Sequence, residues 1–152
     1  MPIKVNPALL FSLAAAFVGG TLIALQAPTN ALLARGAGSA VNAALVSFVI
    51  GTAALLAVAL ALGERPAAGD LKALPWYAWT GGFYGAFFVA VAAFAAPRMG
   101  VTFFLMVAIA GQLAMALLLD RIGAFGLARV EISPTRIGGI ILVLAGAFLV
   151  RR

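Results

Sequence analysis

The feature that most constrains this chain is a series of five long apolar runs, separated by short segments that hold its charged residues. A helix that crosses a bilayer needs about 20 apolar residues, and five such helices would use most of the chain. A soluble fold of 152 residues needs a polar exterior, but 65% of these residues are hydrophobic and 9% are charged. We therefore expect an all-α membrane protein with five transmembrane helices, in a single transmembrane domain over 1–152 within the lipid bilayer.

Capping residues and prolines predict where these helices begin and end. Asn6 before Pro7, Ser39, and Ser133 before Pro134 are typical N-terminal signals. The sequence predicts helices over residues 7–35, 39–62, 75–96, 101–119 and 134–150. The cluster Trp76, Tyr77 and Trp79 at one end of the third helix is typical of a membrane interface.

Two other interpretations of the apolar runs are rejected. Strands of a membrane barrel alternate apolar and polar residues over roughly 10 positions, whereas these runs are apolar on every face. The run over 8–27 is too long for the core of a secretory signal, so we expect it to remain as a span.

The residue inventory argues against catalysis. The chain has no cysteine and no histidine, so it lacks thiolate nucleophiles and the commonest general base and metal ligand. No pair of carboxylates lies inside a predicted span, and Asp120, beside Arg121, is expected to form an interfacial ion pair. We therefore expect that the protein is not an enzyme and that it binds no metal and no cofactor. The net charge of +6 belongs to the headgroup regions, and we expect no nucleic acid as a partner.

The cationic residues are divided almost evenly between the two sides of the membrane. Orientation normally follows an excess of Lys and Arg on the cytoplasmic side, and the margin here is two. A single topology with the N-terminus inside and a dual topology both remain open. In a dual topology, copies inserted both ways would form an antiparallel homodimer with the inverted-repeat symmetry of many transporters. The side of the N-terminus holds Lys4, Arg65, Lys72, Arg121, Arg129 and Arg136, and the other side holds Arg35, Arg98, Arg151 and Arg152.

Uncharged polar residues are the candidates for a substrate pathway. Gln26 and Asn30 are four residues apart and share a face of the first helix. Pro28 lies between them and is expected to kink the helix, because it removes an N–H and disturbs the carbonyl of Ala24. The two amides either line the pathway or serve as structural links to the freed carbonyl or to a neighbouring helix.

Other polar and small residues in the spans have two interpretations each. Gln112 lies in the middle of the fourth helix, where an amide needs a hydrogen-bond partner or a cavity. It either faces the pathway or bonds to a group within the protein. Tyr84 either forms an aromatic wall for a substrate or faces lipid or packs in the core, and Asn42 is assigned a structural role. Close helix packing, within the chain or at a dimer seam, is expected at Gly81, Gly85, Gly139 and Gly146.

A set of motifs in a fixed order resembles the bacterial YdcZ-type family. The first is GTLIALQAPTNALL over 20–33, followed by GS at 38–39 and SFVIG at 47–51. Next come PW at 75–76, GG at 81–82 with Gly85, GQ at 111–112 and DRIGAFG over 120–126. RIGG over 136–139 and Gly146 complete the pattern, which covers nearly the whole chain.

The resemblance implies a five-helix half unit of the drug/metabolite transporter superfamily, in the bacterial inner membrane. The small multidrug exporters, which are similar, carry a glutamate in their first helix that this chain lacks, so their proton-coupled antiport is not transferred. We expect an exporter-like transporter subunit for an unknown small molecule, working as an antiparallel homodimer by alternating access. The alternative is a non-transporting membrane subunit that stabilises a larger partner.

Overall fold

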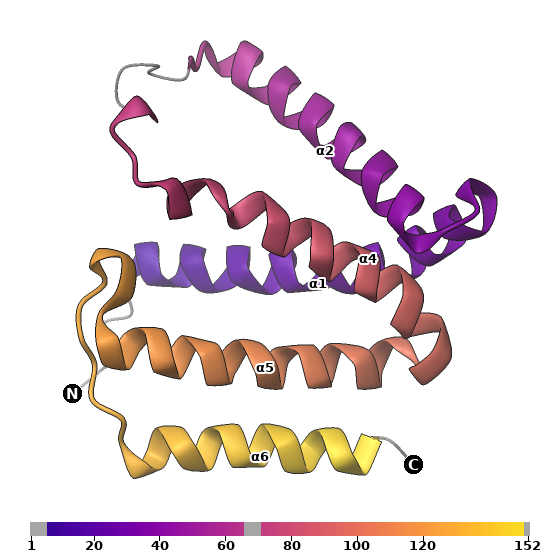
Figure 1. Cartoon of the computed structure of the whole chain (residues 1–152). Coiled ribbons are helices and arrows are strands. Elements are labelled where there is room, and N and C mark those ends of the chain that lie inside the picture. The colour runs from indigo at the N-terminus through magenta and orange to yellow at the C-terminus, as the bar shows by residue number, and fades with distance from the viewer. Residues whose placement is uncertain (1–5, 66–70, 151–152) are drawn as a thin grey trace. The chain divides into compact units, whose positions relative to one another are not determined.

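The structure, a computed structural model, describes residues 6–65 and 71–150, and it is all-helical within these ranges. Lys4, Arg151 and Arg152, which enter the charge count above, lie outside the described residues. Figure 1 shows the order of the elements. They are α1 (Pro7–Ala37), α2 (Ala40–Leu62), the 3₁₀ helix η1 (Trp76–Trp79), α4 (Gly81–Met99), α5 (Val101–Ile122), the 3₁₀ helix η2 (Ala124–Gly126) and α6 (Pro134–Val150).

The turn between α1 and α2 is fixed by local hydrogen bonds. The Asn6 side chain accepts a hydrogen bond from the Ala8 amide at the start of α1, as the sequence predicts. The helix runs two residues beyond its predicted end, because the left-handed conformation that ends it is reached only at Gly38 (φ +82°). Ser39 then caps α2 by accepting from the Asn42 amide. Asn42 Nδ2 donates back to the Ala37 carbonyl at 2.8 Å, which confirms its structural role.

The third predicted span is built from two elements. The aromatic cluster forms η1, and its indole rings are exposed, as an interfacial position requires. The helix α4 continues through Pro97 to Met99, past its predicted end at 96. A proline inside a helix loses its own N–H donor, and in α4 this loss falls in the last turn. Gly100 ends the helix with a φ of +86°.

The loop after α5 folds back on the end of that helix. α5 runs past Asp120 to Ile122 and ends at Gly123, which has a φ of +65°. The Arg129 Nε donates to the Ile122 carbonyl at 3.2 Å, and the Val130 amide donates to the Asp120 carbonyl at 2.9 Å. These bonds satisfy carbonyls that the end of a helix leaves without intrahelical donors.

Ser133 caps α6, because its Oγ accepts from the Arg136 amide at 3.3 Å. The sequence predicted this cap from the Ser–Pro pair at 133–134.

The chain forms two compact units, residues 1–97 and 98–152, each considered by itself. In the first, α1 packs with α2, and in the second, α5 packs with α6. The described interior consists mainly of small residues: nine of the eleven buried hydrophobic residues are alanines, while most large apolar side chains are exposed. A soluble protein shows the opposite pattern. Helices that approach closely within lipid are expected to contact one another through small residues such as alanine, while their large apolar side chains face the lipid.

Four segments of the described chain are long and apolar enough to cross a membrane: α1, α2, the segment from η1 through α4, and α5. The helix α6 is also apolar but shorter, with 17 residues. Length and composition therefore support a multi-pass membrane protein with at least four spans.

Candidate functional site

A groove between α1 and α2 is the candidate for a binding site, because a predicted pathway residue lines it. The two helices pack against each other, and their ribbons diverge from the turn that joins them (Figure 1). The groove has a volume of about 540 Å³, which is within the range of small-molecule sites. Its lining comes from Thr29, Asn30, Leu32, Leu33 and Gly36 on α1 and from Ser47 and Ile50 on α2.

Asn30 is the one buried polar residue among those that the structure describes. The residue is 4% exposed, and its Nδ2 has no hydrogen-bond partner among the described residues. A buried donor without a partner costs about 1–3 kcal/mol, so such groups are rare unless something else binds them. The donor belongs to a residue that lines the groove.

Gln26 lies one turn before Asn30 on α1 and is half-buried. It borders a neighbouring hollow of about 350 Å³, and Thr29 borders both this hollow and the groove. The two predicted amides therefore border neighbouring hollows that share Thr29. Their role as pathway residues stays a prediction.

The helix α1 remains continuous through Pro28, and the predicted kink stays a prediction. A third residue supplies a donor to the preceding turn. The Thr29 hydroxyl donates to the carbonyls of Leu25 and Gln26, each at 3.0 Å. The carbonyl that Pro28 leaves without its donor is that of Ala24, and both bonds of Thr29 go to other carbonyls. Sequence reasoning overlooked Thr29 as a donor to its own helix, although a hydroxyl in an apolar helix was the available signal.

Gln112 and Tyr84 do not line the α1–α2 groove. Gln112 lies on α5, in the second unit, and is exposed. Tyr84 lies on α4 and is 67% exposed, with its hydroxyl 2.9 Å from the Thr80 hydroxyl. Both stay predictions as pathway residues.

Two of the four candidate packing glycines make close contacts within their own unit. A Cβ on Gly85 would lie 3.1 Å from the ring of Phe48, and a Cβ on Gly146 would lie 3.3 Å from the Met106 methyl group. A Cβ on Gly81 or Gly139 would meet no described atom within 4 Å. Gly85 and Gly146 therefore allow close helix approach, while Gly81 and Gly139 leave space at the helix surface.

The ion pair predicted at Asp120 forms with a different partner. Asp120 Oδ2 lies 2.9 Å from Arg136 Nη1, so the bridge joins the end of α5 to the start of α6. Adjacent residues on a helix, such as Asp120 and Arg121, point in different directions and rarely pair. Arg136 is 16 residues away in the sequence, and no local pattern marks it as the partner.

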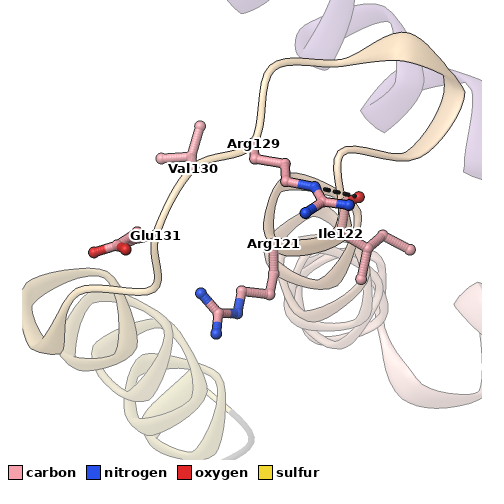
Figure 2. Close-up of a pocket in the computed structure, with 5 residues that line it drawn as sticks. All are labelled: Arg121, Ile122, Arg129, Val130 and Glu131. Atoms are coloured by element: carbon pink, nitrogen blue, oxygen red, sulfur yellow. Dashed lines mark hydrogen bonds between the residues drawn. The ribbon is translucent and has the colours of Figure 1, made fainter.

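A second hollow, of about 470 Å³, lies at the polar end of α5 (Figure 2). Figure 2 shows the Arg129 guanidinium turned to the end of the helix, where it bonds to the Ile122 carbonyl, and the Glu131 carboxylate pointing away from Arg121. Its charged groups do not converge on a common point. This hollow is best explained by the folding back of the loop, and the α1–α2 groove remains the candidate site.

The fold and the groove define a class: a multi-pass helical membrane protein with a buried amide beside a groove that has no ionisable lining residue. The family model described as "Putative inner membrane exporter, YdcZ" matches residues 11–149. The chain belongs to this family and is a protein of the inner membrane, and the family is one of transporters rather than enzymes. Searches among curated proteins and solved structures gave no match.

Proposed function

We propose that this protein exports a small molecule across the inner membrane, as an antiparallel homodimer that works by alternating access. The observation that carries the proposal is Asn30, a buried amide within a membrane-length helix: its Nδ2 has no described partner, and the residue borders a groove in a member of an exporter family. A sheltered polar group within a membrane span is typical of a substrate pathway.

Five crossings are part of this proposal. At 1.5 Å per residue, the 17 residues of α6 extend roughly 25 Å, near the lower limit for a span. An odd number of spans places the two termini on opposite sides. With the cations divided six to four, copies can then insert in both orientations and pair as inverted halves around a shared pathway.

Transport is tested directly with purified protein in liposomes. The liposomes are loaded with a panel of uncharged, cationic and anionic organic solutes, and the release of each solute is compared with that from protein-free liposomes. At least one solute is expected to leave faster when the protein is present. If every solute stays inside at the protein-free rate, the transport proposal fails and a non-transporting subunit becomes the better explanation.

A further inference from the structure

The amide of Gln112 lies where lipid cannot satisfy it. Of the amide side chains that the structure describes, Gln112 is the only one that is exposed in the middle of a membrane-length helix. No hydrogen bond of its side chain is found among the described residues. An amide in hydrocarbon needs a protein partner or a polar cavity, so something beyond this face of α5 must meet Gln112.

The helix α6 packs on a different side of α5. A Cβ on Gly146 of α6 would lie 3.3 Å from the Met106 methyl group. Leu113 and Leu117 line a hollow between the two helices. With about 3.6 residues per turn, these three α5 positions lie roughly 100–140° around the helix axis from Gln112. Within this unit, α6 therefore leaves the face centred on Gln112 open.

The residues around Gln112 form a nearly palindromic pattern. Counted outward from Gln112, a leucine stands seven residues away on either side, an alanine four away, and an isoleucine or a methionine three away. All of these positions lie within about 60° of Gln112 around the helix, and none is buried. Ala116 also borders the hollow toward α6 and is exposed. The six flanking residues are Leu105, Ala108, Ile109, Met115, Ala116 and Leu119.

This symmetry fits a second, antiparallel copy of the same helix. When identical helices pack antiparallel about a twofold axis, a residue before the axis meets the residue equally far after it. With the axis at Gln112, Ala108 meets Ala116, and this small pair lets the backbones approach closely. An axis that relates inverted copies lies at the bilayer midplane. Gln112 is residue 12 of the 22 in α5, roughly 1 Å along the axis from the helix midpoint.

We propose that this face of α5 is a seam of the antiparallel dimer, where the Gln112 amides of the two copies bond to each other. The inference rests on the proposed function, because it names the surface through which the proposed copies pair. A glutamine amide has a carbonyl oxygen and an NH₂ group, so each Gln112 donates one hydrogen bond to the other and accepts one. The flanking residues are all apolar, which favours a packed seam over the wall of a water-filled pathway.

Cysteine cross-linking tests the seam, because the chain has no native cysteine. Variants in membranes are treated with a membrane-permeant reagent that joins two thiols across a short spacer, and the dimer is measured on denaturing gels. Gln112→Cys is expected to cross-link. The matched control is Ala114→Cys, which is exposed at nearly the same depth on the opposite side of α5 and should not cross-link.

Two further positions distinguish antiparallel from parallel copies. Leu105 and Leu119 are roughly 21 Å apart along one helix, too far for the reagent to join them within a chain. The double variant Leu105→Cys with Leu119→Cys should cross-link two copies, because the twofold axis brings the unlike positions together. Each single variant should stay monomeric on the gel.

Gln112→Leu tests the hydrogen bonds themselves. Dimerisation is measured in liposomes by energy transfer between copies labelled at Ala68→Cys, as the protein is diluted with lipid. Gln112→Leu is expected to weaken the dimer about tenfold, the effect of losing two interhelical hydrogen bonds. The matched control, Ala114→Leu, introduces a leucine on the opposite side of α5 and should leave the dimer unchanged.

Cross-linking of Leu105→Cys and Leu119→Cys each by itself would mean that the copies meet in parallel, and it would overturn both this inference and the antiparallel dimer. Energy transfer without cross-linking of Gln112→Cys would overturn the inference alone, because another surface would then join the copies. An equally stable dimer in Gln112→Leu would also overturn it. Solute release from liposomes judges the transport proposal separately, whichever of these results is found.

Discussion

At the scale of single residues, glycines determine where the helices of this protein end. Gly38 and Gly123 both adopt the left-handed conformation, but their surroundings differ. A Cβ on Gly38 would meet no described atom within 4 Å, whereas a Cβ on Gly123 would lie 2.7 Å from Arg129 Cγ and 3.1 Å from the Leu127 carbonyl oxygen. Glycine is therefore favoured at position 123 for two reasons: its left-handed backbone conformation and the close approach of the loop.

Gly123→Ala is expected to destabilise the protein more than Gly38→Ala. Both substitutions incur the left-handed strain of about 1–2 kcal/mol, but only Gly123→Ala also displaces Arg129 from the end of α5. The measurement is the unfolding temperature of each variant in detergent, with circular dichroism as the readout. Equal losses in the two variants would show that the contact with the loop has no energetic role.

Gly85→Ala tests the close approach of α4 to Phe48. The added methyl group would lie 3.1 Å from the tip of the Phe48 ring, so the ring must shift by a few tenths of an ångström, at a cost of about 1 kcal/mol. The matched control is Gly81→Ala, because a Cβ on Gly81 has open space. We expect a lower unfolding temperature for Gly85→Ala only. A stabilised Gly85→Ala variant would contradict the packing role.

At the scale of elements, an ion pair and a folded loop join α5 to α6. The side chains of Arg136 and Asp120 are 43% and 37% exposed, so solvent screens their attraction. A double-mutant cycle with Asp120→Asn and Arg136→Gln should give a coupling free energy below about 1 kcal/mol, decreasing as salt is added. A coupling of several kcal/mol would mean that the pair is sheltered in the assembled protein.

Local sequence signals predicted the helices well, but they did not predict contacts between residues that are far apart in the sequence. The caps at Asn6, Ser39 and Ser133 satisfy helix amides within three residues, so the sequence alone indicated them. The partner of Asp120 depends on how the chain folds back after α5, which no periodicity encodes. In α4, the nearby glycine at 100 determined the helix end instead of the proline at 97.

The candidate site was predictable in part. An amide within an apolar helix is visible in the sequence, and Asn30 was identified from it. Its lack of a partner depends on the position of α2 beside α1, which only the three-dimensional structure shows. The same limit applies to Gln112 and Tyr84, which the sequence also offered as candidates and whose side chains are exposed in the structure.

At the scale of the whole molecule, the antiparallel dimer makes a prediction about orientation. The chain has no native cysteine, so Ala68→Cys introduces a single thiol between the second and third predicted spans. In intact cells, a membrane-impermeant thiol reagent should label a substantial fraction of the protein, and permeabilised cells should show the remainder. Labelling only after permeabilisation, or complete labelling before it, would establish a single orientation and contradict the dual topology.

The most direct test of the central claim is the release of a transported solute through protein with and without the Asn30 amide. Liposomes with the unchanged protein, Asn30→Leu and the control Ser12→Ala are prepared at equal protein content. Ser12 is exposed and outside the groove, and its hydroxyl donates to the Ala8 carbonyl of its own helix. We expect Asn30→Leu to release the solute at least tenfold more slowly, with the helical content and the Ser12→Ala rate unchanged. Release at the full rate by Asn30→Leu would contradict the assignment of the α1–α2 groove as the pathway.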